Sequence, residues 1–105
     1  MPAQVQDDMG AALLDVQYGD VPEGAKPFGE GVRSEVWKIV DNYDGDTYRA
    51  VYTAAFPEAV YLLHVFKKKS KRGDETPRPD VERVNARFKA AREHYERTYL
   101  NRSDL

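Results

Sequence analysis

The chain of 105 residues contains no cysteine, only two histidines and a single tryptophan. The absence of cysteine excludes a disulfide framework, a zinc site built from thiolates and catalysis by a cysteine nucleophile. With His64 and His94 as the only imidazoles, we do not expect a histidine-rich metal site. The acidic turn around Gly45 resembles a calcium loop, but no glutamate stands at the last of the twelve loop positions. We therefore expect neither a metal ion nor another cofactor.

The sequence also lacks long hydrophobic runs. No apolar segment approaches the roughly 18–20 residues that a membrane-spanning helix needs. The first ten residues include two aspartates and neither lysine nor arginine, which is not typical of a secretory signal peptide. These features predict a cytoplasmic protein without a membrane partner. The length and the 41% of apolar residues predict one domain, spanning residues 1–105, with a thin core.

The net charge of −2 is an average over two unlike halves. Residues 1–60 contain 4 Lys and Arg against 11 Asp and Glu, which gives −7. Residues 61–105 contain 12 Lys and Arg against 7 Asp and Glu, which gives +5. Such an asymmetry indicates a polyanionic partner for the basic half.

The hydrophobic pattern predicts two helices around a small sheet. Apolar residues recur at helical spacing over residues 4–18 and 80–100, and Thr76-Pro77 or Asp80 could cap the second helix. Residues 20–31, which contain several glycines and prolines, are expected to form an ordered loop.

Three segments between the helices are expected to be strands, over residues 32–40, 47–55 and 59–66. Asp44-Gly45 indicates a hairpin turn between the first two. The third is the most apolar, so we expect it in the middle of the sheet. The predicted fold class is α+β, with a small antiparallel sheet of about three strands backed by an N-terminal helix and a long C-terminal helix.

A basic cluster follows the last predicted strand, because five of the six residues from Lys67 to Arg72 are cationic. One interpretation is a solvated strand exit that discourages edge pairing. The other is a patch that binds the phosphates of a nucleic acid. Aromatic residues on the neighbouring strands favour the second, because bases stack on aromatic rings. These residues are Tyr48, Tyr52, Tyr61 and Phe66.

Three single residues add to this pattern. Arg49 lies in the middle of a predicted strand, where an arginine either extends to solvent or meets an anion. His64 is either a satisfied, partly buried side chain or an acid/base group or substrate contact near the cluster. Among the arginines of the last helix, Arg87 lies next to the apolar stripe and is the one expected to contact RNA.

The segment from Asp44 to Phe88 resembles the RelE/HigB superfamily of bacterial toxins, and within it the phage-derived HigB-like subgroup. In that subgroup a Y-R-x-x-Y strand is followed by L-H-x-F-x-K-K-[ST] and by a T-P helix start. The matching residues here are Tyr48, Arg49 and Tyr52; Leu63, His64, Phe66, Lys68, Lys69 and Ser70; and Thr76 and Pro77. The resemblance extends from about residue 12 to about residue 90.

The resemblance implies a microbial-ribonuclease-like fold and an endoribonuclease that cleaves mRNA on the ribosome. The family's chemistry uses no metal: the ribose 2′-OH attacks the adjacent phosphate, and cationic side chains stabilise the developing charge. It also implies a cognate antitoxin, commonly a helix-turn-helix protein. The implied catalytic residues are Arg49, Lys68 and Lys69, with His64 added as a possible acid/base group. The resemblance implies that Lys67 and Lys71 hold flanking RNA, and we predict Arg72, Arg87 and Tyr52 as further RNA-binding residues.

Two features depart from the family pattern. The chain begins too late to hold the first strand of family members, so we expect an exposed sheet edge or partner surface. Lys38 also stands where the subgroup commonly has a glutamate. Three functions therefore stay open: a ribosome-dependent endoribonuclease toxin, a degenerate module that only binds its partner or RNA, and a phage accessory protein that shares the fold.

Overall fold

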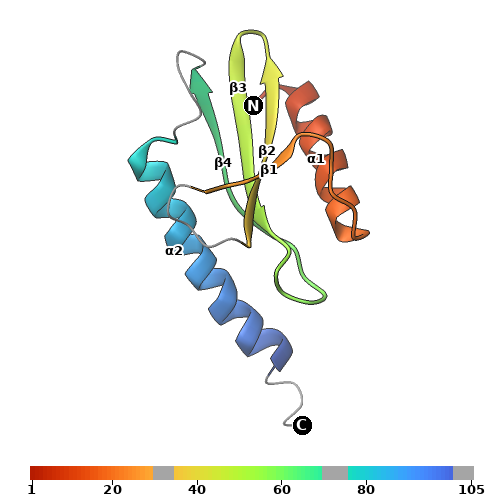
Figure 1. Cartoon of the computed structure of the whole chain (residues 1–105), viewed down its shortest axis with the longest axis vertical. Helices are drawn as coiled ribbons and strands as arrows, with labels where there is room; N and C mark the ends of the chain where they lie inside the picture. The colour runs from red at the N-terminus through yellow and green to blue at the C-terminus, as the bar shows by residue number, and fades with distance from the viewer. Residues whose placement is uncertain (30–34, 70–75, 101–105) are drawn as a thin grey trace.

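The computed structural model describes residues 1–29, 35–69 and 76–100. Figure 1 shows helices packed on a sheet, with the C-terminal helix extending beyond the sheet toward the C-terminus. The elements in chain order are α1 (Ala3–Gln17), β1 (Ala25–Pro27), β2 (Val36–Tyr43), β3 (Asp46–Thr53), β4 (Tyr61–Lys69) and α2 (Arg78–Tyr95), which continues into a π-helical turn (Glu96–Leu100).

The sheet has four antiparallel strands in the order β1-β2-β3-β4. The hairpin between β2 and β3 closes at Asp44 and Gly45, whose φ angles are 52° and 82°. Positive φ at both central residues is the geometry of a tight two-residue hairpin turn, which asparagine, aspartate and glycine adopt most readily. The hairpin signal in the sequence is therefore confirmed, although β2 extends to Tyr43 rather than ending at residue 40.

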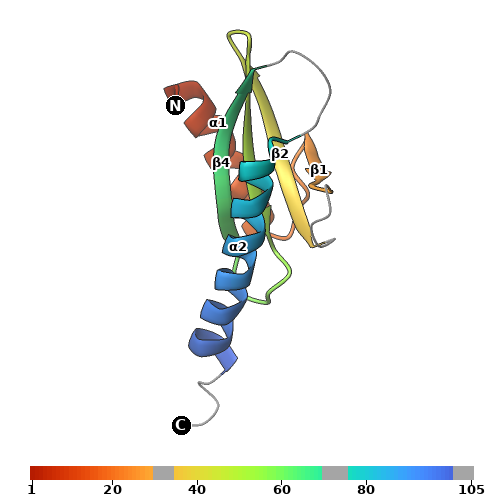
Figure 2. The same ribbon diagram turned by 90° about the vertical axis from the view of Figure 1, so that its left-hand side faces the viewer.

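The two helices cover opposite faces of the sheet, which Figure 2 shows with α2 in front and α1 behind. Successive side chains of a strand point to opposite faces. In β3, Tyr48, Ala50 and Tyr52 accordingly pack in the cluster under α1, whereas Val51 packs in the cluster under α2. By the same alternation, Arg49 shares the α2 side with Val51.

The structure confirms the α+β class with its N-terminal helix and long C-terminal helix, but the sheet has four strands instead of three. The additional strand β1 lies inside the segment predicted to be a loop, residues 20–31. Three residues are too few to show an alternating pattern, so pairing with β2 determines this strand. Pro27, at its end, is tolerated because β1 is an edge strand.

The prediction that the most apolar strand lies in the middle of the sheet is wrong, because β4 is an edge strand. Its hydrophobicity reflects packing on both faces. Leu63 belongs to the cluster under α2, and Val65 packs against the cluster under α1. The inner strand β3 is buried over seven of its eight residues, although it contains Thr47 and Arg49.

Helix α2 begins at Arg78, two residues earlier than predicted, after Pro77 as the N-cap residue. No side chain makes a capping hydrogen bond to this end of the helix. Asp80 lies in the first turn instead, and its carboxylate contacts β4. Of the predicted Thr76-Pro77 and Asp80, Pro77 is therefore confirmed as the N-cap residue, and Asp80 is wrong as a cap. The fixed backbone angle of proline lets the helix start without a side-chain cap.

Candidate functional site

Two of the predicted catalytic residues lie on the α2 side of the sheet. Arg49 is opposite Phe66 in the β3–β4 register, and His64 is opposite Val51, two residues along the strands. Both are nearly closed to solvent, with exposed fractions of 3% for Arg49 and 7% for His64. The rings of His64 and Phe66 are stacked with centroids 5.2 Å apart. Phe66 is thus next to both residues.

His64 connects β4 to α2 through both of its ring nitrogens. Its Nε2 lies 2.7 Å from Asp80 Oδ1, and Arg87 Nη1 donates to its Nδ1 over 3.1 Å. A guanidinium can only donate, so Nδ1 must be an acceptor, and the proton sits on Nε2 and is donated to Asp80. The network therefore assigns the neutral imidazole, held between a cation and an anion. In this arrangement the ring orients the first turns of α2 against β4.

A β-bulge in β4 shapes this site. Val51 pairs with His64 and Tyr52 pairs with Leu62, so Leu63 has no partner in the ladder. The carbonyl oxygen of Leu63 accepts a hydrogen bond of 2.9 Å from Arg87 Nη1. Bulges often occur beside functional sites, where they redirect side chains. Here the bulge allows the consecutive residues Leu63 and His64 both to face α2.

The basic end of β4 is only partly described. Lys67 is half-exposed, pairs in register with Tyr48, and has its Nζ 3.7 Å from Asp46 Oδ2. The backbones of Lys68 and Lys69 continue the strand and pair with the start of β3. Their side chains, and the whole of Lys71 and Arg72, lie outside the described residues. Of the four predicted catalytic residues, the structure therefore brings together Arg49 and His64.

The structure does not bring Tyr52 to this site. Tyr52 is 4% exposed and packs in the α1 cluster, on the face opposite to Arg49. Burial raises the pKa of its phenol above the usual value of 10.0, so the group is neutral at pH 7. Tyr48 is buried on the same face. The aromatic surface expected beside the basic cluster is therefore limited, among the described residues, to Phe66, since Tyr61 packs against Phe56 at the other end of β4.

Two residues of this site were missed by the sequence reasoning. Asp80 was assigned to helix capping, and only the packing of α2 on β4 brings its carboxylate to His64. Lys38 is only 5% exposed. It pairs with Val51 on one side, and Val51 pairs with His64 on the other, so the three residues lie side by side across the sheet. The alternation of β2 carries a signal for this position, because Trp37 and Ile39 on either side belong to the α1 face.

The arrangement suits an anion. Lys38 and Arg49 place two cationic side chains on the same nearly buried face, and Arg87 adds an exposed guanidinium at its rim. Charge–charge attraction is stronger away from bulk water than at the exposed surface. An arginine fork also matches the paired oxygens of a phosphate. Cationic groups of this kind bind phosphate and stabilise added negative charge on it.

Replacing His64 by phenylalanine is expected to lower the free energy of unfolding by about 1–3 kcal/mol, because Asp80 and Arg87 each lose a partner. Urea unfolding measures the change. The double variant with Asp80→Asn should lose less than the sum of the two single changes, as expected for residues in one network. Strictly additive losses would contradict the connection described. Glu82→Gln, at an exposed position of the same helix, provides the control.

Two classes of feature are not found in the described part of the chain. Within residues 1–29, 35–69 and 76–100, no three His, Asp or Glu side chains are grouped to hold a metal ion. Nor is any helix of these segments long and apolar enough to cross a membrane.

A model of the family described as "Phage derived protein Gp49-like (DUF891)" matches residues 1–89. This range includes α1, the sheet and α2 as far as Phe88 and Lys89, and hence Arg49, His64, Asp80 and Arg87. No curated protein and no solved structure matches the chain. The match covers most of the chain and the whole segment that carries the resemblance to bacterial toxins. The chain therefore belongs to the phage-derived Gp49-like family, which is a RelE/HigB-like toxin family.

Proposed function

We propose that the chain is the toxin of a type II toxin–antitoxin system, from the phage-derived HigB-like subgroup, and that it cleaves mRNA on the ribosome without a metal ion. The observation that carries the proposal is the position of Arg49. Arg49 lies on the inner strand β3, on the face that α2 covers. The lysine-rich end of β4 pairs with the same strand. Membership of a toxin family supports a toxic activity for this arrangement.

The proposed reaction is attack of a ribose 2′-OH on the adjacent phosphate, with departure of the 5′-oxygen of the next nucleotide. Negative charge grows on the phosphate oxygens as the new bond forms. The Arg49 fork, with Lys68 and Lys69 from the strand end, stabilises that charge more strongly in the transition state than in the ground state. Phe66, beside Arg49, offers a ring face to an unstacked base.

The remaining site residues take supporting roles in this proposal. His64 has both ring nitrogens engaged, which supports a positioning role that holds α2 against β4. The exposed Lys67 and Arg87 contact flanking phosphates of the RNA, together with Lys71 and Arg72. A protein antitoxin, of the helix-turn-helix type, neutralises the toxin. The ribosome positions the mRNA, and such positioning contributes to the rate.

Expression of the wild-type chain in a bacterial host tests the proposal. We expect growth arrest, cleavage of reporter mRNA in a translating extract, and relief of both by the product of the neighbouring gene. The same mRNA without ribosomes should stay intact, because the reaction depends on positioning by the ribosome. Harmless expression together with intact mRNA in the translating extract would exclude the endoribonuclease.

A degenerate binding module is the second candidate. Two observations favour it: the 3% exposure of Arg49, which leaves little of the guanidinium open to a substrate, and Lys38 in place of the glutamate common in the subgroup. Such a protein would co-purify with the neighbouring gene product and leave mRNA intact. The extract assay and the co-purification together separate the two candidates.

A further inference from the structure

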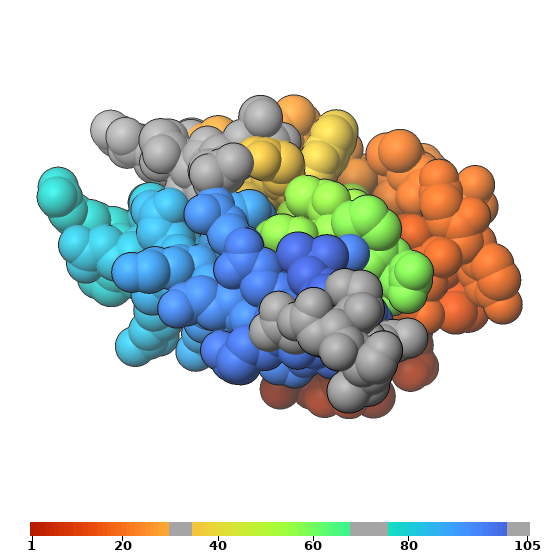
Figure 3. Space-filling model, turned by 90° about the horizontal axis from the view of Figure 1, so that it is seen from below, coloured from red at the N-terminus to blue at the C-terminus, as the bar shows by residue number. Residues whose placement is uncertain are grey.

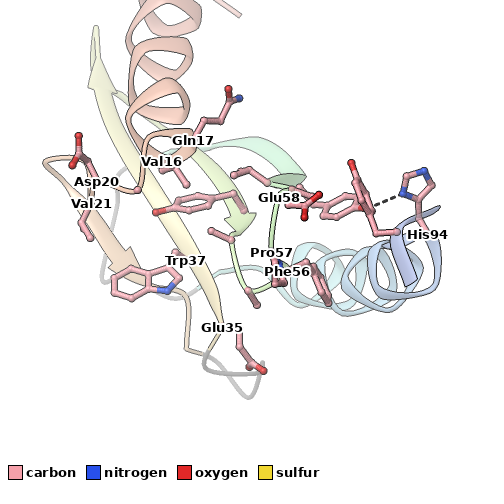
Figure 4. Close-up of a pocket in the computed structure, with 18 residues that line it drawn as sticks. Val16, Gln17, Asp20, Val21, Glu35, Trp37, Phe56, Pro57, Glu58 and His94 are labelled. Carbon is pink, nitrogen blue, oxygen red and sulfur yellow. Dashed lines mark hydrogen bonds between the residues drawn. The ribbon is translucent and has the colours of Figure 1, made fainter. Parts of the chain in front are cut away.

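A hollow of about 1010 Å³ opens at the end of the sheet away from the β2–β3 turn. Its walls come from the end of α1, the start of β2, the β3–β4 connection and the end of α2 (Figure 4). Seen from this end in Figure 3, the β3–β4 connection in green lies between the blue end of α2 and the orange segment that follows α1. The hollow is thus distant along the strands from Arg49 and the basic end of β4.

Aromatic side chains dominate the walls. Five of the lining residues carry a six-membered aromatic ring, namely Trp37, Tyr52, Phe56, Tyr61 and Tyr99. Phe56 meets Tyr61 edge to face at 5.8 Å, and a hydrogen bond of 2.7 Å joins the Tyr61 hydroxyl to His94 Nδ1, the dashed contact in Figure 4. These contacts hold part of the wall in a defined shape.

The charge of the walls has one sign. Among the described residues that line the hollow are three carboxylates, Asp20, Glu35 and Glu58, and neither lysine nor arginine. Aromatic faces attract cations through their quadrupole, and carboxylates attract them through their charge. A concave wall with both groups favours a guanidinium or an ammonium group and disfavours RNA.

Exposed apolar side chains lie beside the hollow. Val21, which lines it, is 72% exposed; Leu14 and Tyr18, one helical turn apart at the end of α1, are 50% and 79% exposed. Adjacent exposed apolar side chains are typical of surfaces that bind another protein. A small cation would fill only the hollow and leave these side chains in water. A protein segment can cover both.

We propose that this end of the sheet docks a segment of a partner protein in which arginine or lysine side chains stand beside apolar ones. The cationic groups enter the aromatic hollow near Glu58 and Asp20, and the apolar side chains cover Tyr18 and Val21. The docking surface is separate from the Arg49 face, so it is independent of whether the chain cleaves RNA.

Fluorescence of the intact chain tests the docking surface, because Trp37 is the only tryptophan and lines the hollow. The probe is a 14-residue helical peptide without tryptophan, with leucines on one face and four arginines flanking them. We expect a saturable change in Trp37 emission. A peptide with glutamate in place of each arginine should not produce it, and spermidine, a cation without an apolar face, should bind at least about tenfold more weakly.

Charge reversal supplies the matched variants. Asp20→Lys combined with Glu58→Lys, both at exposed positions, should weaken peptide binding at least about tenfold, which corresponds to about 1.4 kcal/mol. Asp7→Lys combined with Glu82→Lys, at exposed positions that do not line the hollow, should bind as the wild type does. Circular dichroism verifies that each variant is folded. No saturable change, equal binding of the glutamate peptide or of spermidine, or unchanged binding by Asp20→Lys/Glu58→Lys would each overturn the proposal.

Discussion

Replacing Arg49 by methionine is expected to lower the rate of mRNA cleavage by at least about 100-fold, the loss usually seen when one donor to a developing charge is removed. Methionine has a similar reach and tolerates burial, so the variant loses the charge and the fork while the buried volume stays largely filled. Cleavage of a reporter mRNA in a translating extract measures the rate. In the bacterial host, the same change should relieve growth arrest.

Two controls separate the loss of charge from a loss of structure. Arg83→Met removes an exposed guanidinium of α2 and should cleave at the wild-type rate. Arg49→Lys keeps the charge but not the fork, so its rate should lie between those of the wild type and Arg49→Met. Thermal unfolding shows whether each variant is folded. A folded Arg49→Met protein that cleaves as fast as the wild type would refute the role proposed for Arg49.

Replacing Phe88 by alanine is expected to lower the free energy of unfolding by about 3–5 kcal/mol, the usual cost of removing a buried aromatic ring. Phe88 is 5% exposed and belongs to the cluster that joins α2 to the sheet. Its ring centroid lies 5.8 Å from that of Phe56, and the guanidinium carbon of Arg92 lies 5.5 Å from its centre. The loss is a large part of the roughly 5–15 kcal/mol that stabilise a typical domain.

Urea unfolding of Phe88→Ala beside Lys89→Ala measures this effect, since Lys89 is exposed on the same helix. The lysine variant should change the free energy of unfolding by less than about 0.5 kcal/mol. Similar losses in the two variants would mean that α2 does not depend on this core. Because α2 also carries Asp80 and Arg87, the phenylalanine variant should lose cleavage activity as it unfolds.

Much of the fold follows from local patterns in the sequence. Helical spacing of apolar residues located both long helices, and Asp44-Gly45 located the hairpin, because these signals depend only on residues close in the chain. The short strand β1 carries no such signal, since its pairing with β2 is a tertiary contact. The edge position of β4 escaped prediction for a related reason: burial of both faces makes a strand apolar wherever it lies in the sheet.

The candidate site was predictable in part. An arginine within a strand drew attention to Arg49, and the structure places it on the α2 side of the sheet. The contact from His64 to Asp80 depends on how α2 packs, which no local pattern shows. The separation of Tyr52 from Arg49 was already contained in the alternation of β3, since residues 49 and 52 differ by an odd number of positions. The prediction that Tyr52 binds RNA rested on its aromatic ring and did not use this alternation.

The bulge at Leu63 divides β4 into two segments with different phase. The residues before it, Tyr61 and Leu62, meet β3 in one register, and those from His64 onward meet it in another. A deletion of Leu63 would restore a regular ladder in which Tyr52 still pairs with Leu62 and Val51 with His64, so both segments would keep their faces. The deletion would instead remove the Leu63 side chain from the cluster under α2 and the carbonyl that accepts a hydrogen bond from Arg87. The bulge therefore supplies α2 with one more residue contact from β4 than a regular strand would.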